Sequence, residues 1–229
     1  KKSYHYDNAE DMLHHLIQKE HANSKYYFFL GENKLLDYNS DTISNSLAEF
    51  TNAAKDIFQK GVSANGSDPL NYVGLAKVAT YLGDEATAAA MRAKAKSFLL
   101  PYKNIKKMVP PAKDYAFALA KIAESYITYS KADTSQALPL IRQAVRIDPK
   151  NPEIYLIAGD IYILVPDGTN AIKNYNMAQM YDPKSPTANM KIGNIYVRGK
   201  NLQAAIPLFE EAISLDANYA PAYRELGQL

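Results

Sequence analysis

The sequence predicts an all-α fold, a right-handed superhelical solenoid of antiparallel helix pairs. Small and aromatic residues of 152–185 recur at the same positions in 186–219, and a third, partial copy begins at 220. A self-similar period of this length, about 34 residues, marks a solenoid whose unit is a pair of helices. In addition, Asn151-Pro152 and Ser185-Pro186 each place a capping residue before a proline, which is typical of a helix start.

The recurring positions have a physical reason in helix packing. Small residues at Gly159, Ala171 and Ala178 let helix axes approach to about 8–10 Å, and tyrosines fill the space around those points. A single helix pair cannot bury its apolar side, so neighbouring pairs must stack. We therefore interpret the recurring glycines and tyrosines as packing residues rather than as parts of a ligand site.

The composition limits the classes of function. The chain has 229 residues, 47% of them hydrophobic, so it can bury a core and is not expected to be disordered. A net charge of +2 gives no reason to expect nucleic acid as a partner, because nucleic-acid-binding proteins normally carry a basic face or stripe. The absence of cysteine excludes disulfides and thiolate chemistry, and no apolar run is long enough for a transmembrane helix. Because the sequence begins with lysine and stops inside a repeat, we expect a fragment of a longer protein.

Two regions are expected along the chain. Residues 1–68 form an N-terminal helical segment that includes an irregular helix pair, and residues 69–229 form the repeat array. The units of the array are 69–102, 114–151, 152–185, 186–219 and the partial 220–229, with a Pro- and Lys-rich linker at 103–113. We interpret that linker as a solvated connection; a docking site for an acidic partner is the alternative.

Two units depart from the pattern of 152–185. In 69–102, Ala79 and Arg92 stand where the pattern has aromatic residues, so we expect looser packing in this unit. In 114–151 the register slips by two residues within the loop, and Ser135 is the predicted cap of the second helix.

Two short motifs in the N-terminal region suggest ligands, and neither is favoured. Asp11 and His15 share a helix face, but no third metal ligand stands at a recognisable spacing, so an exposed polar face is preferred. Gly61 and Gly66 are spaced as in a phosphate loop, but the lysine that this motif needs is absent, so Gly61 is predicted to be a helix C-cap before a turn. We expect no cofactor, no metal and no catalytic residue, because no nucleophile–base pair is evident.

The pattern of 152–185 resembles the tetratricopeptide repeat (TPR). The small, aromatic and proline markers of that repeat agree from Tyr155 to Pro183, and a looser similarity covers 69–229. The segment 218–227, with the abundant tyrosine, asparagine and lysine, is similar to exported TPR proteins of the Bacteroidota. This implies the periplasm or cell envelope, with the cytoplasm as the alternative. Asp41-Thr42-Ile43 is similar to an O-glycosylation signal of those bacteria.

The resemblance also implies a binding site. In TPR proteins the first helix of each pair lines a concave groove that holds a peptide or another protein. Carried over to this sequence, the groove residues are Val73, Lys77, Tyr81, Glu124, Leu156, Asp160, Ile163, Met190, Asn194, Arg198 and Arg224. Met190 and Asn194 match only half of the family's clamp for a C-terminal carboxylate, so that specificity is not predicted.

These expectations favour a non-enzymatic interaction scaffold that binds a peptide or protein partner in its groove. The alternative is a structural assembly component that stacks or oligomerises through its terminal helices. In that case 220–229 is the expected self-association surface, because Tyr223 and Leu226 are expected to be exposed there.

Overall fold

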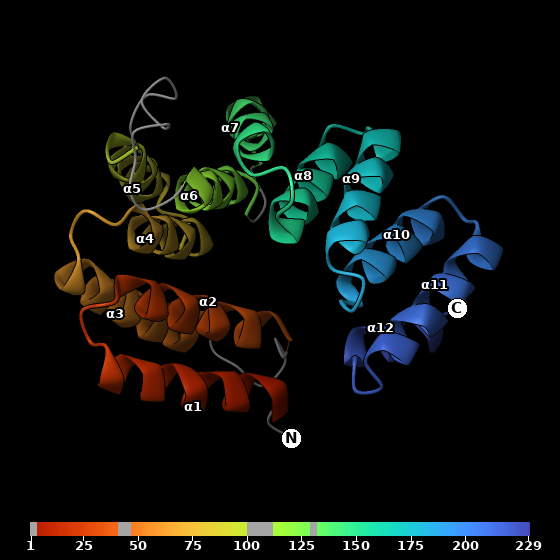
Figure 1. Ribbon diagram of the computed structural model, residues 1–229, viewed down its shortest axis with the longest axis horizontal. Helices are drawn as coiled ribbons and strands as arrows, with labels where there is room; N and C mark the ends of the chain where they lie inside the picture. Colours follow the sequence, from red (N-terminus) through yellow and green to blue (C-terminus); the bar gives the residue numbers. More distant parts are fainter. Residues whose placement is uncertain (1–3, 41–46, 100–111, 129–131) are drawn as a thin grey trace. The chain divides into compact units, whose positions relative to one another are not determined.

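The computed structural model describes residues 4–40, 47–99, 112–128 and 132–229. Over these residues it contains twelve α-helices and no β-strand, which confirms the predicted all-α class (Figure 1). The predicted linker at 103–113 lies outside the described residues except for its last two, and Asp41-Thr42-Ile43 lies wholly outside them. No helix in the described ranges is long and apolar enough to cross a membrane.

The chain divides into two compact units, residues 1–110 with 125–131 and residues 111–124 with 132–229. Helices of the first unit are α1 (Tyr4–Lys19), α2 (Ser24–Ser40), α3 (Leu47–Ala64), α4 (Pro69–Tyr81) and α5 (Glu85–Ser97). Helices of the second unit are α6 (Ala112–Ser125, its last residue assigned to the first unit), α7 (Thr134–Ile147), α8 (Pro152–Leu164), α9 (Gly168–Tyr181), α10 (Thr187–Arg198), α11 (Leu202–Leu215) and α12 (Ala220–Leu226). The predicted boundary between 68 and 69 follows the repeat register, whereas contacts join α2 and α3 to α4 in one unit.

Phe58 of α3 occupies the centre of the first unit. Its ring is fully buried and lies against Gly31 of α2 and Gly74 of α4, where a Cβ atom on either glycine would overlap the ring. The missing side chains let three helices meet around one aromatic ring. Gly61 also lies inside α3, with the amide of Asn71 against its open side, so the predicted C-cap at Gly61 is wrong and the helix continues to Ala64.

A buried polar network joins the start of α4 to the start of α2. Asp68 caps α4 by accepting a hydrogen bond from the Leu70 amide at 3.0 Å, and it accepts another from the hydroxyl of Ser24. Asn71 donates its side-chain amide to the Ser24 carbonyl at 3.0 Å. These hydrogen bonds offset the cost of removing the polar side chains from water.

Arg92 of α5 is a buried cation in the first unit. It is 7% exposed and donates to Thr80 Oγ1 and to the Ser125 carbonyl, both at 2.7 Å. Its guanidinium lies 4.9 Å from the ring centroid of Tyr126, a distance at which a cation is attracted to an aromatic face. Ala79, by contrast, helps to line a hollow of about 270 Å³. The looser packing that the sequence predicts for this unit is not found at the buried Arg92, and at Ala79 it stays a prediction.

The second unit uses one packing arrangement twice. In α8 and α9 the ring of Tyr175 lies on Gly159, and in α10 and α11 the ring of Phe209 lies on Gly193. A Cβ atom on either glycine would overlap the ring, and both rings are almost completely buried. This confirms the predicted packing role of Gly159 and Gly193, whereas the third recurring glycine, Gly227, is the exposed C-cap of α12. α10 packs on α9, and α12 packs on α11 (Figure 1).

The helix caps follow the prediction at α8 and differ at two other helices. Asn151 accepts hydrogen bonds from the amides of the first turn of α8, with proline next to it. The N-cap of α7 is Asp133 and not Ser135, because Asp133 accepts the Gln136 amide while the Ser135 hydroxyl donates to Asp133. At α10 the proline itself stands in the N-cap position without a side-chain hydrogen bond.

Candidate functional site

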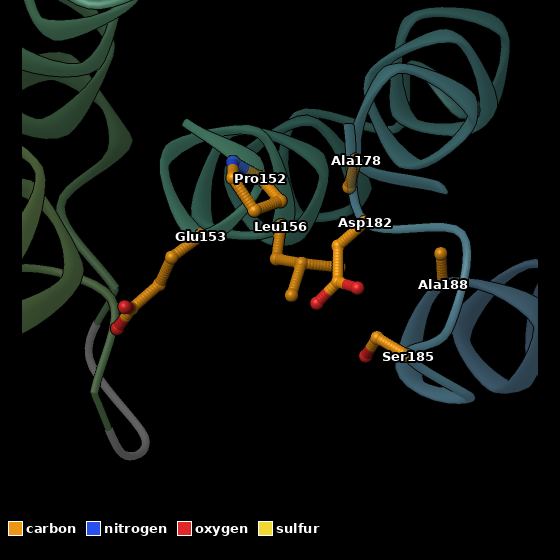
Figure 2. A pocket seen from close by; sticks show the side chains of 7 residues that line it. All are labelled: Pro152, Glu153, Leu156, Ala178, Asp182, Ser185 and Ala188. Atoms are coloured by element: carbon orange, nitrogen blue, oxygen red, sulfur yellow. The ribbon is translucent and has the colours of Figure 1, made fainter. Parts of the chain in front are cut away.

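The α8–α10 pocket is a hollow of about 370 Å³ in the second unit. The residues that line it are Pro152, Glu153 and Leu156 of α8, Ala178 and Asp182 at the end of α9, and Ser185 and Ala188 at the start of α10 (Figure 2). The pocket therefore lies where the first turn of α8, the end of α9 and the start of α10 come together.

One wall of the α8–α10 pocket is apolar. Ala178 and Ala188 are each 2% exposed, and their short side chains leave space that a larger side chain would fill. Leu156 is half-buried and points into the same space (Figure 2). A volume of about 370 Å³ lies in the lower part of the range of ligand sites, about 300–1,000 Å³, and gives room for one long side chain.

Asp182 gives the α8–α10 pocket a negative charge. It ends α9, where its backbone amide donates to the Ala178 carbonyl at 2.8 Å, and its carboxylate points toward the side of Leu156 (Figure 2). The C-terminal end of α9 adds a partial negative charge at Asp182, while the starts of α8 and α10, which line the same pocket, contribute partial positive charge. An apolar wall beside this anion suits the stem and charged head of a lysine or arginine side chain.

The side chain of Glu153 contacts a neighbouring helix, α6, and is not directed into the pocket. Its carboxylate points away from the other labelled side chains (Figure 2), and its Oε1 is 2.7 Å from Nζ of Lys121 on α6. The same nitrogen is 3.3 Å from Oε2 of Glu124, and Lys121 is 6% exposed. Because the carboxylate of Glu153 points toward Lys121, Asp182 is the anion that is directed into the α8–α10 pocket.

Asp160 connects three helices further along α8. Its Oδ1 accepts a hydrogen bond from the Tyr175 hydroxyl of α9 at 2.7 Å and lies 2.6 Å from Nζ of Lys191 on α10. Burial, followed by the charge of Asp160, raises the pKa of Tyr175 well above its ordinary value, so the phenol stays protonated and donates. Asp160 therefore stabilises the packing of α8, α9 and α10 as well as standing at a predicted groove position.

Three of the predicted groove residues are buried. Val73 is 0% exposed, Met190 5% and Lys77 6%. Nζ of Lys77 is 2.7 Å from Oε2 of Glu32 on α2, so this cation is engaged inside the first unit. In this structure the three side chains face other helices, and none of them offers a surface contact.

The remaining predicted groove residues are at least partly accessible. Tyr81, Glu124, Leu156, Asp160, Ile163 and Asn194 are half-buried, and Arg198 and Arg224 are exposed. Val73, Lys77 and Tyr81 belong to the first unit and the others to the second. Of the accessible residues, only Leu156 lines the α8–α10 pocket, so the binding role of the others stays a prediction.

Asp182 is a site residue that was not predicted as one, because Asp182-Pro183 was predicted only to end the helix. A signal was present in the repeat itself. Asp148, Asp182 and Asp216 recur one period apart, and each follows the last residue of a second helix. Asp148 and Asp216 accept hydrogen bonds from the turn that follows, at 3.4 Å from the side chain of Asn151 and at 2.9 Å from the backbone amide of Asn218, so the recurrence also has a structural cause.

The histidine segment does not assemble into a metal centre in the described part of the chain. There, no group of three or more His, Cys, Asp or Glu side chains is placed to hold a metal ion. Asp11 and His15 are both exposed, and the nearest charged contact of His14 is Glu10 at 3.5 Å.

Comparison with protein families agrees with the helix-pair architecture. Residues 186–219 match the family model of the tetratricopeptide repeat. The matched segment is the helix pair α10–α11, and it is similar to a single tetratricopeptide repeat. No curated protein matches the sequence.

Solved structures, two of them described as TPR proteins, share the fold over almost the whole chain. TTC0263, a thermophilic TPR protein of Thermus thermophilus, has a TM-score of 0.60 at 16% identity and covers 90% of this chain and 97% of its own. YrrB, a TPR protein described as having an unusual peptide-binding site, has a TM-score of 0.52 at 14% identity and covers 94% and 97%. A human IFIT1 dimer with PPP-AAAA has a TM-score of 0.62 at 16% identity, covering 91% of this chain but 45% of that chain. At these identities the likeness shows the fold alone, and it confirms the predicted TPR-type solenoid. The resemblance to exported proteins of the Bacteroidota stays a prediction.

Proposed function

We propose that this protein is a non-enzymatic interaction scaffold that binds an extended segment of a partner protein over α8 and α10. The TPR fold supports the scaffold role, because proteins with this fold generally act by holding other proteins, and the similar YrrB is described as having a peptide-binding site. An extended segment suits a surface on which separate pockets read individual side chains.

The observation that carries the proposal is the carboxylate of Asp182 beside the apolar wall of the α8–α10 pocket. Within the described residues, no cation is paired with Asp182. A lysine or arginine of the partner lays its methylenes against Leu156 and brings its cation to Asp182. The proposed partner segment therefore carries one basic residue as its anchor.

Two predicted groove residues on α10 extend the surface. Asn194 is half-buried and Arg198 is exposed one helical turn later. An asparagine amide can donate to and accept from a peptide backbone, and an arginine can hold a carboxylate of the same segment. These contacts fix the direction of the segment, while the α8–α10 pocket supplies most of the selectivity.

A peptide selection tests the proposal. Random peptides are displayed and selected on the protein, and the affinity of the enriched sequences is measured by fluorescence anisotropy. We expect enriched peptides to share a lysine or arginine, and Asp182→Asn to weaken their binding about tenfold, as loss of a charge-assisted hydrogen bond does.

Asp216→Asn is the matched control, because Asp216 ends α11 one period later and does not line the α8–α10 pocket. It should leave the affinity unchanged. Peptides without a basic residue, or equal affinities of the wild type and Asp182→Asn, would contradict the proposal.

Self-assembly is the second candidate, and one observation favours it. Tyr223 of α12 is 51% exposed, as predicted, whereas Leu226 is half-buried against the core of α11 and α12, so its predicted exposure is wrong. If Tyr223 is a self-association contact, sedimentation velocity will show an oligomer that Tyr223→Glu converts to a monomer. A wild-type protein that stays monomeric at high concentration excludes this function.

A further inference from the structure

A second hollow in the second unit, which we call the α7–α9 pocket, has the opposite charge. Its volume is about 380 Å³. The lining residues are Ile141, Arg142, Val145 and Arg146 of α7, Tyr155, Ala158 and Tyr162 of α8, and Asn170, Lys173, Asn174 and Met177 of α9. It shares no residue with the α8–α10 pocket.

Three cations line the α7–α9 pocket, and no carboxylate does. Arg142 and Arg146 are four residues apart and so lie on the same face of α7, and Lys173 comes from α9. All three are exposed, and within the described residues none of them is paired with a carboxylate. Nε of Arg142 donates to the hydroxyl of Tyr162 at 3.4 Å, which directs this guanidinium across toward α8.

The neighbouring carboxylate, Asp167, is held by other groups. Its Oδ1 accepts the backbone amide of Asn170 at 3.0 Å, and its Oδ2 accepts the side-chain amide of the same residue at 2.7 Å. Asp167 is therefore used as the cap of α9. Within the described residues, the three cations of the pocket therefore have no carboxylate among the lining side chains.

The wall of the α7–α9 pocket is apolar. Ile141 and Ala158 are 1% and 2% exposed, and Val145 and Met177 are half-buried beside them. The hydroxyl of Tyr155 donates to the Pro149 carbonyl at 3.0 Å, which holds the tyrosine in place. A hollow with such a wall and three cations fits a ligand that has an apolar body and a multiply charged anionic group.

We infer that the α7–α9 pocket binds a small phosphate monoester with an aromatic or apolar body. A carboxylate carries one charge and is satisfied by one bidentate arginine, whereas a phosphate monoester carries about −1.5 to −2 at neutral pH and three acceptor oxygens. Arg142 and Arg146 supply planar donors for two of those oxygens, and Lys173 supplies a point charge for the third. The body of the ligand lies on Ile141, Val145 and Met177.

Isothermal titration calorimetry with phenyl phosphate tests this assignment. We expect saturable binding with one site per chain, weakened about tenfold by Arg146→Gln and by Lys173→Gln, since each removes a charge-assisted hydrogen bond. Lys184→Gln is the control, because Lys184 is exposed, removes the same charge and does not line the pocket. It should bind phenyl phosphate as the wild type does.

Two further probes test the two parts of the ligand. Inorganic phosphate should bind more weakly than phenyl phosphate, because it lacks the apolar body, and phenylacetate should bind more weakly because it carries a single charge. Absence of saturable binding, or an equal loss in Lys184→Gln, overturns the site. Phenylacetate as tight as phenyl phosphate overturns the phosphate assignment, and inorganic phosphate as tight overturns the role of the apolar wall.

Discussion

The helix pairs α4–α5 and α8–α9 have the same repeat register but are built around different chemical groups. In α8–α9, the ring of Tyr175 rests on Gly159 and its hydroxyl donates to Asp160. The corresponding positions in α4–α5 are occupied by Arg92 and Ala76, and both are buried. An aromatic contact in one pair is therefore replaced by a buried cation in the other.

The residues at these two register positions depend on each other, because the space left at the first position limits the side chain at the second. A Cβ atom at Gly159 would overlap the ring of Tyr175, and Ala76 has that Cβ atom. An aromatic ring at position 92 would meet the same obstacle, whereas an arginine can extend past it. The guanidinium of Arg92 donates hydrogen bonds to Thr80 Oγ1 and to the Ser125 carbonyl.

The largest expected effect is at the close contact of α8–α9. Gly159→Leu should lower the free energy of unfolding by about 3 kcal/mol or more, because even a Cβ atom there overlaps the Tyr175 ring. Urea unfolding monitored by circular dichroism measures it. Gly168→Leu is the control, since Gly168 of α9 has open space around it, and it should change stability by less than about 1 kcal/mol. Equal effects of the two substitutions would show that α8 and α9 do not meet at Gly159.

Arg92→Met tests the buried cation of α4–α5. The substitution keeps much of the stem but leaves Thr80 Oγ1 and the Ser125 carbonyl without their donor, so we expect a loss of about 2 kcal/mol. Lys94→Met, on the exposed side of the same helix, should cost less than about 0.5 kcal/mol. If Arg92→Met leaves the urea midpoint unchanged, the cation contributes nothing to the unit.

A double-mutant cycle tests the dependence of the two positions directly. Arg92→Tyr alone should destabilise the protein, and Ala76→Gly added to it should recover about 1 kcal/mol beyond the sum of the single effects. The reason is that glycine opens the space that Gly159 provides for Tyr175. Additive effects, within about 0.5 kcal/mol, would mean that the choice of arginine has another cause.

The smallest expected effect concerns a feature that the two pairs share. Asp84 and Asp167 cap α5 and α9, each accepting the amide of the residue three positions later at 3.0 Å. These hydrogen bonds, from Thr87 and Asn170, lower the pKa of both carboxyls below the ordinary value. A lowered folded-state pKa gives stability that is present above the ordinary pKa, near pH 4, and is lost as the pH falls through the folded-state pKa.

Measuring the free energy of unfolding at a series of acid pH values tests this direction of the pH dependence. The free energy of unfolding should fall less steeply below about pH 4 in Asp84→Asn and in Asp167→Asn than in the wild type, and by similar amounts in the two variants. A steeper decline in either variant would contradict the assignment of these carboxylates as stabilising caps.

The repeat register and the close-packing glycines could be predicted because they depend on period and side-chain size alone. Gly159 and Gly193 lie where the pattern places them, each under an aromatic ring. The residue at which α3 ends could not be predicted in the same way. A glycine at a helix end and a glycine under a neighbouring side chain look alike in sequence, and at Gly61 the neighbour is Asn71 of the following helix.

The candidate site was predicted less completely than the fold. The groove positions were carried over from the family, which assigns a face to each position but not its burial in this chain. Val73 is 0% exposed because α4 is covered within its unit, whereas Leu156, at the same register position of α8, lines a pocket. Asp182 was missed because its role depends on two alanines from different helices, Ala178 and Ala188, that leave space beside it.

The central claim is that α8 presents a binding pocket where α4 presents a packed surface. Methyl NMR spectra of the protein, titrated with a peptide selected for binding, test it most directly. We expect the methyl signals of Leu156, Ala178 and Ala188 to shift and the signals of Val73 to stay unchanged. Shifts at Val73, or shifts confined to the α7–α9 pocket at Ile141 and Val145, would contradict it.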